Sequence, residues 1–204
     1  MDRSEGRRVF PFKYNVMLVN GAVLKTGHTD NAVYLNGRDQ YVDLDKHMDR
    51  CLGNIDLCLH GQTVSLWINP EELKNGDYFL ATPTYTLFYG DGNINAEYRG
   101  KTKTWYASSS RLKENTWQRI TLAWHPTKGL TLFINDELMS QDRRGENIPR
   151  DRPYSEHIYV GRNLVSPRSS AKFLMDDIQV WYDDLDQLLA TGQYRSKYLA
   201  SFIY

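Results

Sequence analysis

Short runs in which apolar and polar residues alternate recur along the whole chain, with turn-forming residues between them. In residues 63–68, for example, Val64, Leu66 and Ile68 share one face of an extended chain, and the residues between them share the other. This period-two pattern predicts strands that each cover one side of a core. Because such runs follow one another without amphipathic helices between them, we expect an all-β fold of two antiparallel sheets packed face to face.

Turn-forming residues join three pairs of these runs and predict three β-hairpins. The predicted hairpins join residues 33–35 to 41–44 through Asn36-Gly37, 84–89 to 94–98, and 117–124 to 130–134. Other strands are expected at 63–68, ending at Asn69-Pro70, and at 158–161. The last strand is expected at 173–182, with four apolar residues in phase: Leu174, Ile178, Val180 and Tyr182. A short helix is expected to follow at 184–190.

The charge balance and the short apolar runs of the chain argue against two classes of partner, nucleic acids and the interior of a membrane. Among 204 residues, 25 Lys and Arg are matched by 25 Asp and Glu, and this neutrality argues against a dedicated nucleic-acid binder. No apolar run is long enough to span a bilayer, so direct membrane insertion is not expected.

No flexible linker divides residues 14–195, which we interpret as one domain with flanks at 1–13 and 196–204.

Six segments together resemble the laminin-G-like, concanavalin-A-like domains, in the branch that includes pentraxin-like modules. The matching segments are residues 32–44, 63–68, 117–124, 130–135, 158–162 and 176–181. The resemblance implies a jelly-roll sandwich in an extracellular matrix or cell-surface protein, where most relatives are binding or architectural modules. The pentraxin signature itself is missing, because the corresponding strand reads Gln62 to Trp67 without its His and Cys, so a pentameric pentraxin is not supported.

The two cysteines, Cys51 and Cys58, are close enough in sequence to form a local disulfide. Paired cysteines outside a metal motif, in an all-β chain of extracellular type, usually oxidise, so we expect a disulfide and a secreted or ectodomain location. The alternatives are two free thiols in a cytosolic protein, or a zinc site that would need further ligands.

Asp176 and Asp177 stand inside an otherwise apolar strand, where an unpaired buried carboxylate would be costly. Jelly-roll modules similar to this chain often hold a structural calcium ion between a late Asp and an early loop, so Asp177, Asp176 and the distant Asp43 are candidate calcium ligands. The alternative is that loop amides donate hydrogen bonds to one carboxylate while the other faces water or an Arg.

Two groups of residues are candidates for ligand binding. A loop presents four guanidinium groups suited to sulfated glycans, from Arg143, Arg144, Arg150 and Arg152, although nearby acidic residues dilute their charge. Aromatic residues of the middle hairpins, among them Tyr85, Tyr89 and Trp105, could stack on a sugar ring. In a sandwich, such residues more often fill the faces of the sheets.

The sequence shows no motif of an active site. The paired carboxylates of concanavalin-A-like glucanases are missing, as are nucleophile-elbow, metalloprotease and phosphate-loop motifs. We therefore expect a non-enzymatic, lectin-like adhesion module that binds a glycan or a protein within a larger protein. The alternatives are an architectural or assembly domain without its own ligand, and a glycan-active hydrolase.

Overall fold

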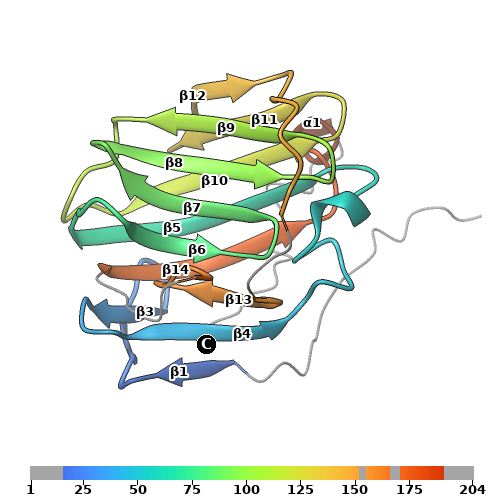
Figure 1. Ribbon diagram of the computed structural model, residues 1–204. Coiled ribbons are helices and arrows are strands. Elements are labelled where there is room, and N and C mark those ends of the chain that lie inside the picture. The colour runs from blue at the N-terminus through green and yellow to red at the C-terminus, as the bar shows by residue number, and fades with distance from the viewer. Residues whose placement is uncertain (1–15, 152–154, 166–170, 191–204) are drawn as a thin grey trace, which may run out of the picture.

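The computed structural model describes residues 16–151, 155–165 and 171–190, which form a sandwich of two seven-stranded antiparallel sheets (Figure 1). Sheet A has the order β1 (Met17–Val19), β4 (Tyr41–Lys46), β13 (His157–Val160), β6 (Asp77–Ala81), β7 (Tyr85–Gly90), β8 (Asn93–Arg99) and β9 (Thr104–Ser109). Sheet B has the order β12 (Glu137–Asp142), β11 (Gly129–Ile134), β10 (Gln118–His125), β5 (Gln62–Glu72), β14 (Lys172–Trp181), β3 (Asn31–Asn36) and β2 (Val23–Thr26).

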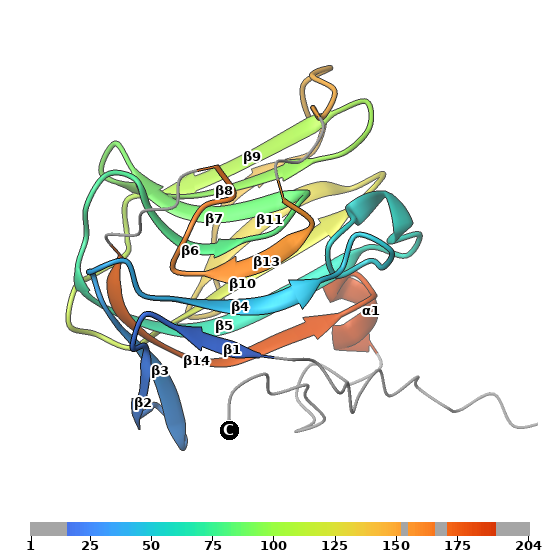
Figure 2. The same cartoon turned by 60° about the horizontal axis from the view of Figure 1, so that its bottom comes forward.

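Besides the strands, the described residues contain two short helices. The 3-10 helix η1 (Ile55–Leu57), which the sequence analysis did not predict, precedes β5. The helix α1 (Leu185–Ala190) follows β14, where the sequence predicts a short helix (Figure 2). Among the described residues, no helix is long and apolar enough to cross a membrane. The predicted domain boundaries at 14 and 195 lie outside the described residues, as do the two flanks.

The core lies between the two sheets and is built from the apolar phase of each strand. Across sheet A, one inward row runs through the registered residues Val42, Val160, Leu80, Leu87, Ala96 and Ala107. All of them are buried and pack in the same core as Val64, Leu66 and Ile68 of β5 in sheet B. The period-two pattern therefore predicted the correct inward face for β5.

The first predicted hairpin is wrong. β3 pairs with β2 and β14 in sheet B, whereas β4 pairs with β1 and β13 in sheet A, so residues 37–40 carry the chain from one sheet to the other. The Gln40 side chain fixes this corner, because it accepts a hydrogen bond from the Asn36 amide (2.8 Å) and donates one to the Gly21 carbonyl (2.5 Å). Both strands keep their apolar residues in the core, but from opposite layers.

The second and third predicted hairpins are confirmed as β7–β8 and β10–β11. The strand predicted at 63–68 is longer than expected: β5 passes through Pro70 and reaches Glu72. Pro70 pairs with Phe173 of β14 beside an irregularity in register, which is where a sheet tolerates a residue without a backbone donor.

The predicted phase of the last strand is half right. In β14, Phe173 and Met175 point into the core instead of Leu174, and the phase changes before Ile178, which is buried. A bulge between Asp176 and Gln179, where Asp177 has a φ of 48°, inserts the extra residue that causes this change.

Candidate functional site

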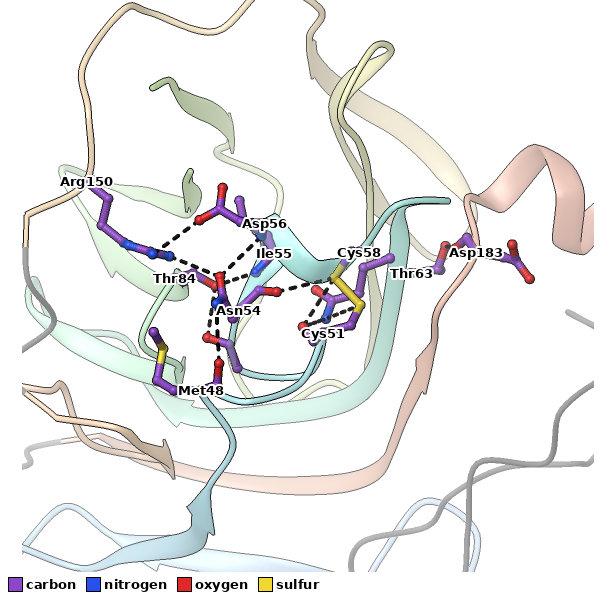
Figure 3. Close-up of a disulfide and its surroundings, with 12 residues drawn as sticks. Met48, Cys51, Asn54, Ile55, Asp56, Cys58, Thr63, Thr84, Arg150 and Asp183 are labelled. Atoms are coloured by element: carbon purple, nitrogen blue, oxygen red, sulfur yellow. Dashed lines mark hydrogen bonds and ion pairs between the residues drawn. A yellow bond between two sulfur atoms is a disulfide. The ribbon is translucent and has the colours of Figure 1, made fainter. Parts of the chain in front are cut away.

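The predicted disulfide is present and closes the loop before β5 (Figure 3). Asn54 caps η1 inside this loop, since its side-chain oxygen accepts the Asp56 amide at 3.2 Å. The Thr84 hydroxyl accepts the Ile55 amide and donates to the Gly53 carbonyl, both at 3.1 Å. The disulfide and these hydrogen bonds therefore fix the loop against β7.

The three described arginines of the predicted basic loop do not form one basic surface. Arg150 points inward, where its guanidinium lies 3.2 Å from a carboxylate oxygen of Asp56 (Figure 3), and its side chain is only 12% exposed. Arg143 and Arg144 are exposed, and Arg143 donates to the side chain of Gln141 at 2.8 Å. Arg152 lies outside the described residues. The predicted role of Arg150 in ligand binding is therefore wrong, and Arg150 has a structural role in its ion pair with Asp56.

Of the three predicted stacking aromatics, two are buried in the core and the third is half-buried against it. Tyr85 is 2% exposed and stacks on the ring of Tyr98, with 4.7 Å between ring centroids. Trp105 is 6% exposed and meets Trp124 edge to face, and Tyr89 packs against the core from the same side as Tyr85. The interpretation of Tyr85 and Trp105 is therefore wrong, because a buried ring cannot stack on a ligand, whereas stacking on Tyr89 stays a prediction.

The three predicted calcium ligands do not come together. Asp43 lies in sheet A, where His157 Nδ1 approaches its carboxylate at 2.9 Å, whereas Asp176 and Asp177 lie in sheet B. No group of three or more His, Cys, Asp or Glu residues suited to a metal ion occurs in residues 16–151, 155–165 and 171–190. As a set of ligands these three residues do not fit one ion, and calcium binding stays a prediction.

Asp176 instead follows the alternative reading, in which amides compensate the buried carboxylate. One of its oxygens accepts the backbone amides of His28 (2.9 Å) and Thr29 (3.0 Å), and the other accepts the amide of Asp177 (2.8 Å). Asp177 accepts the Thr29 hydroxyl at 3.1 Å. The two carboxylates therefore attach the β2–β3 turn to β14.

Asp177→Asn should raise the unfolding midpoint at pH 7 but leave it nearly unchanged at pH 3. Burial, and then the charge of Asp176, raise the pKa of the Asp177 carboxyl in the folded protein. The folded state thus prefers the protonated carboxyl. Ionisation of Asp177 therefore lowers the free energy of unfolding as the pH rises above the ordinary pKa of about 4. Below that pH the carboxyl is protonated in both states, and the cost disappears. Thermal unfolding followed by circular dichroism at both pH values measures the difference.

Asp91→Asn is the matched control, because Asp91 has a similar left-handed backbone (φ 54°) in an exposed turn. This variant measures how much the replacement of Asp by Asn changes the unfolding midpoint through the left-handed backbone conformation alone. An equal gain for both variants at both pH values would contradict a role for the buried charge at Asp177.

The outer face of sheet A carries a different set of aromatic side chains, which we call the tyrosine face. It is defined by Tyr41, Tyr78, Phe88, Tyr106 and Tyr159, which come from β4, β6, β7, β9 and β13. One registered row across the sheet is Asp43, Tyr159, Ala81, Thr86, Glu97 and Tyr106. Registered neighbours point to the same side, so this row lies opposite the inward row that ends at Ala107.

Ring contacts and hydrogen bonds connect the members of the tyrosine face. Tyr41 and Tyr159 meet edge to face at 5.6 Å, and the guanidinium of Arg162 lies over both rings, at 4.8 and 5.0 Å. Tyr78 stacks on Phe88 at 5.3 Å. Asn163, next to Arg162 in the chain, hydrogen-bonds with the Tyr78 hydroxyl and so links the two pairs of rings.

Charged groups border the rings at the far end of the face. Glu97 is 8% exposed, and it accepts hydrogen bonds from Arg99 (2.6 Å) and from the hydroxyl of Tyr106. Burial, and then the Glu97 carboxylate, raise the pKa of Tyr78 and of Tyr106, so both stay neutral hydroxyls at neutral pH. The face thus presents rings, phenol groups and cations side by side, a combination that suits binding more than chemistry.

The carboxylates in this row are too far apart for glycoside hydrolysis. Asp43 and Glu97 are separated by four strand spacings, or about 19 Å. Retaining and inverting glycosidases need carboxyl groups about 5 Å and about 6.5–9.5 Å apart. Each carboxylate is also engaged, Asp43 by His157 and Glu97 by Arg99.

A family model described as the Concanavalin A-like lectin/glucanases superfamily, in its laminin G branch, matches residues 36–188, three quarters of the chain. The chain belongs to this superfamily. The two sheets agree with its jelly-roll sandwich, so the resemblance seen in the sequence and the predicted all-β fold are both confirmed. Comparison with curated proteins finds no match to the chain.

Solved structures with a similar fold include domains of botulinum neurotoxins. The receptor binding domain of botulinum neurotoxin C/D mosaic serotype matches at a TM-score of 0.66 and 14% identity, over 90% of this chain and 46% of that chain. The binding domain of Paraclostridial Mosquitocidal Protein 1 matches at 0.63 and 18%, over 89% and 47%. The botulinum neurotoxin serotype D ligand binding domain, in complex with N-acetylneuraminic acid, matches at 0.62 and 14%, over 88% and 46%. The chain spans less than half of each.

Proposed function

We propose that this domain is a non-enzymatic, extracellular binding module of a larger adhesion or matrix protein, and that its tyrosine face binds a glycan. The single observation that carries the proposal is the continuous band of half-buried rings, phenol groups and arginines across the outer side of sheet A. Sugars have apolar faces that stack on rings and hydroxyls that pair with such polar groups.

Three further observations support parts of this proposal. The structural neighbours are named as receptor-binding or ligand-binding domains, one of them in complex with a sugar acid. The Cys51–Cys58 disulfide is typical of oxidising compartments, which supports an extracellular location. The separation of about 19 Å between Asp43 and Glu97 supports a role without catalysis.

A glycan array, run in calcium and again in chelator, tests the proposal. The double variant Tyr106→Ala/Tyr159→Ala should lower the apparent affinity for the bound glycans by about tenfold or more, because two stacking rings are lost. Tyr34→Ala is the matched control, since Tyr34 lies in sheet B, where Lys25 covers its ring.

Each result of the array has a defined meaning. Equal binding by the wild type and the double variant, or loss of binding in Tyr34→Ala alone, would contradict the tyrosine face as the site. Binding that disappears in chelator would support the calcium prediction. Heparin on the same array, with an Arg143→Glu/Arg144→Glu variant, tests the predicted sulfated-glycan partner through the two exposed arginines.

An architectural or assembly role is the second candidate, favoured by the edge strands β1 and β2. These strands lie at the same side of the sandwich and expose four apolar side chains, Met17, Leu18, Val23 and Leu24, beside the exposed Val16 that precedes β1. Exposed apolar edges are ready to pair with another protein. Sedimentation of the domain at increasing concentration tests self-assembly, and a monomer throughout would argue against it.

A further inference from the structure

A groove of about 160 Å³ opens on the outer side of sheet B, on the opposite layer from the tyrosine face. Its floor comes from β10 and β11, one wall comes from β12, and the other comes from the first residues of α1. Ala123, Thr131 and Gln141 are registered neighbours in this sheet, as are Phe133 and Leu138. The strands therefore place these five side chains on one face.

Apolar and polar side chains both line the floor and walls of the groove. Phe133 is half-buried, Leu138 is 57% exposed, and Leu185 of α1 lines the same groove. Thr131 on the floor and Gln141 on the β12 wall form a polar strip, joined by a hydrogen bond of 3.1 Å from the Gln141 amide to the Thr131 hydroxyl. One small ring with an apolar face and hydroxyls at its rim fits such a lining.

The mouth of the groove holds an ionic network. Lys128 lies 2.5 Å from Asp184 and 2.8 Å from Asp186, and the imidazole of His125 is 4.0 Å from Asp184. The lining thus contains two carboxylates and one ammonium group, which leaves an excess of negative charge. This charge disfavours sulfated or carboxylated sugars, while carboxylates and Lys are good partners for neutral hydroxyls.

We propose that this groove is a second binding site, which takes one neutral pyranose ring, such as the terminal hexose of a glycan. The volume decides the size of the occupant, because sites for drug-sized ligands measure about 300–1,000 Å³. The apolar floor holds the face of the ring, and Gln141, Thr131 and the carboxylates at the mouth bind its hydroxyls. The proposal is independent of ligand binding at the tyrosine face.

Chemical-shift mapping on the ¹⁵N-labelled domain tests this site. The probes are the methyl glycosides of glucose, galactose, mannose and N-acetylglucosamine, with N-acetylneuraminic acid and butylamine for comparison. We expect at least one neutral glycoside to shift the amides of the groove with a dissociation constant in the millimolar range, about −4 kcal/mol. Ala123→Leu, which fills the floor, should weaken this binding by about tenfold or more.

Leu138→Ser is a second variant at an exposed position, so it tests the wall of the groove with little risk to folding, and it should also weaken binding. Tyr34→Ala, in β3 and outside both the groove and the tyrosine face, is the matched control and should bind the glycoside as the wild type does. The proposal would be overturned by the absence of groove shifts with any neutral glycoside, by equal shifts with N-acetylneuraminic acid, or by groove shifts with butylamine alone. Shifts confined to the tyrosine face would also overturn it, while supporting the proposed function.

Discussion

Gly129→Ala should destabilise the domain by about 2–5 kcal/mol. Gly129 has a φ of 85°, a left-handed conformation that costs a residue with a Cβ atom about 1–2 kcal/mol. A Cβ there would also overlap the Asp142 carbonyl oxygen and lie 2.7 Å from the Arg143 Cα, and overpacking of this kind adds about 1–3 kcal/mol. Urea unfolding measures the change as a shift of the midpoint.

Gly92→Ala separates the two causes. Gly92 sits in the β7–β8 turn with a similar φ of 76°, but no atom lies within 4 Å of the position of its Cβ. It should therefore show only the backbone cost of about 1–2 kcal/mol. Equal losses in the two variants would show that the contact between the start of β11 and the end of β12 contributes nothing.

Removing the disulfide with Cys51→Ala/Cys58→Ala should lower the free energy of unfolding by about 2.5 kcal/mol, the loop-closure entropy of an eight-residue loop. Alanine avoids an unpaired hydroxyl, because both positions are buried. The two sheets should still form, since Thr84 and Arg150 hold the same loop through Ile55, Gly53 and Asp56.

Reductant provides the control for this variant. It should lower the midpoint of the wild-type protein towards that of the double variant, and it should leave the double variant unchanged. A reductant effect on the variant would show that the loss does not arise from the bond. Unchanged stability of the double variant would show that the side-chain contacts alone restrict the loop.

Local patterns predicted the parts of the fold whose strands are close in sequence. The β7–β8 and β10–β11 hairpins were correct because each turn joins two strands that pair with each other. Residues 36–41 have the same local signals, yet they connect two layers. The partners that decide this outcome, β13 and β14, lie more than a hundred residues later in the chain, where a local pattern has no information.

The tyrosine face was missed for a related reason. In β7, Tyr85 and Tyr89 flank Leu87 on the more apolar side, whereas Phe88 shares its side with Thr86. The alternation places Phe88 outward, so the signal for the tyrosine face was available within this strand. Joining Phe88 to Tyr41 and Tyr159 required the order of the strands in sheet A, which no motif encodes.

Gly129, Gly92 and the disulfide affect local geometry, whereas the corner at residues 37–40 governs how the whole chain reaches its structure. β3 and β4 lie in different layers. β3 pairs with the edge strand β2 and with β14, and β4 pairs with the edge strand β1 and with β13. On a ribosome, the early strands therefore emerge long before their later partners exist. We expect slow folding, as in other proteins dominated by pairings distant in sequence, and a nascent chain that must be kept from aggregating until β14 emerges.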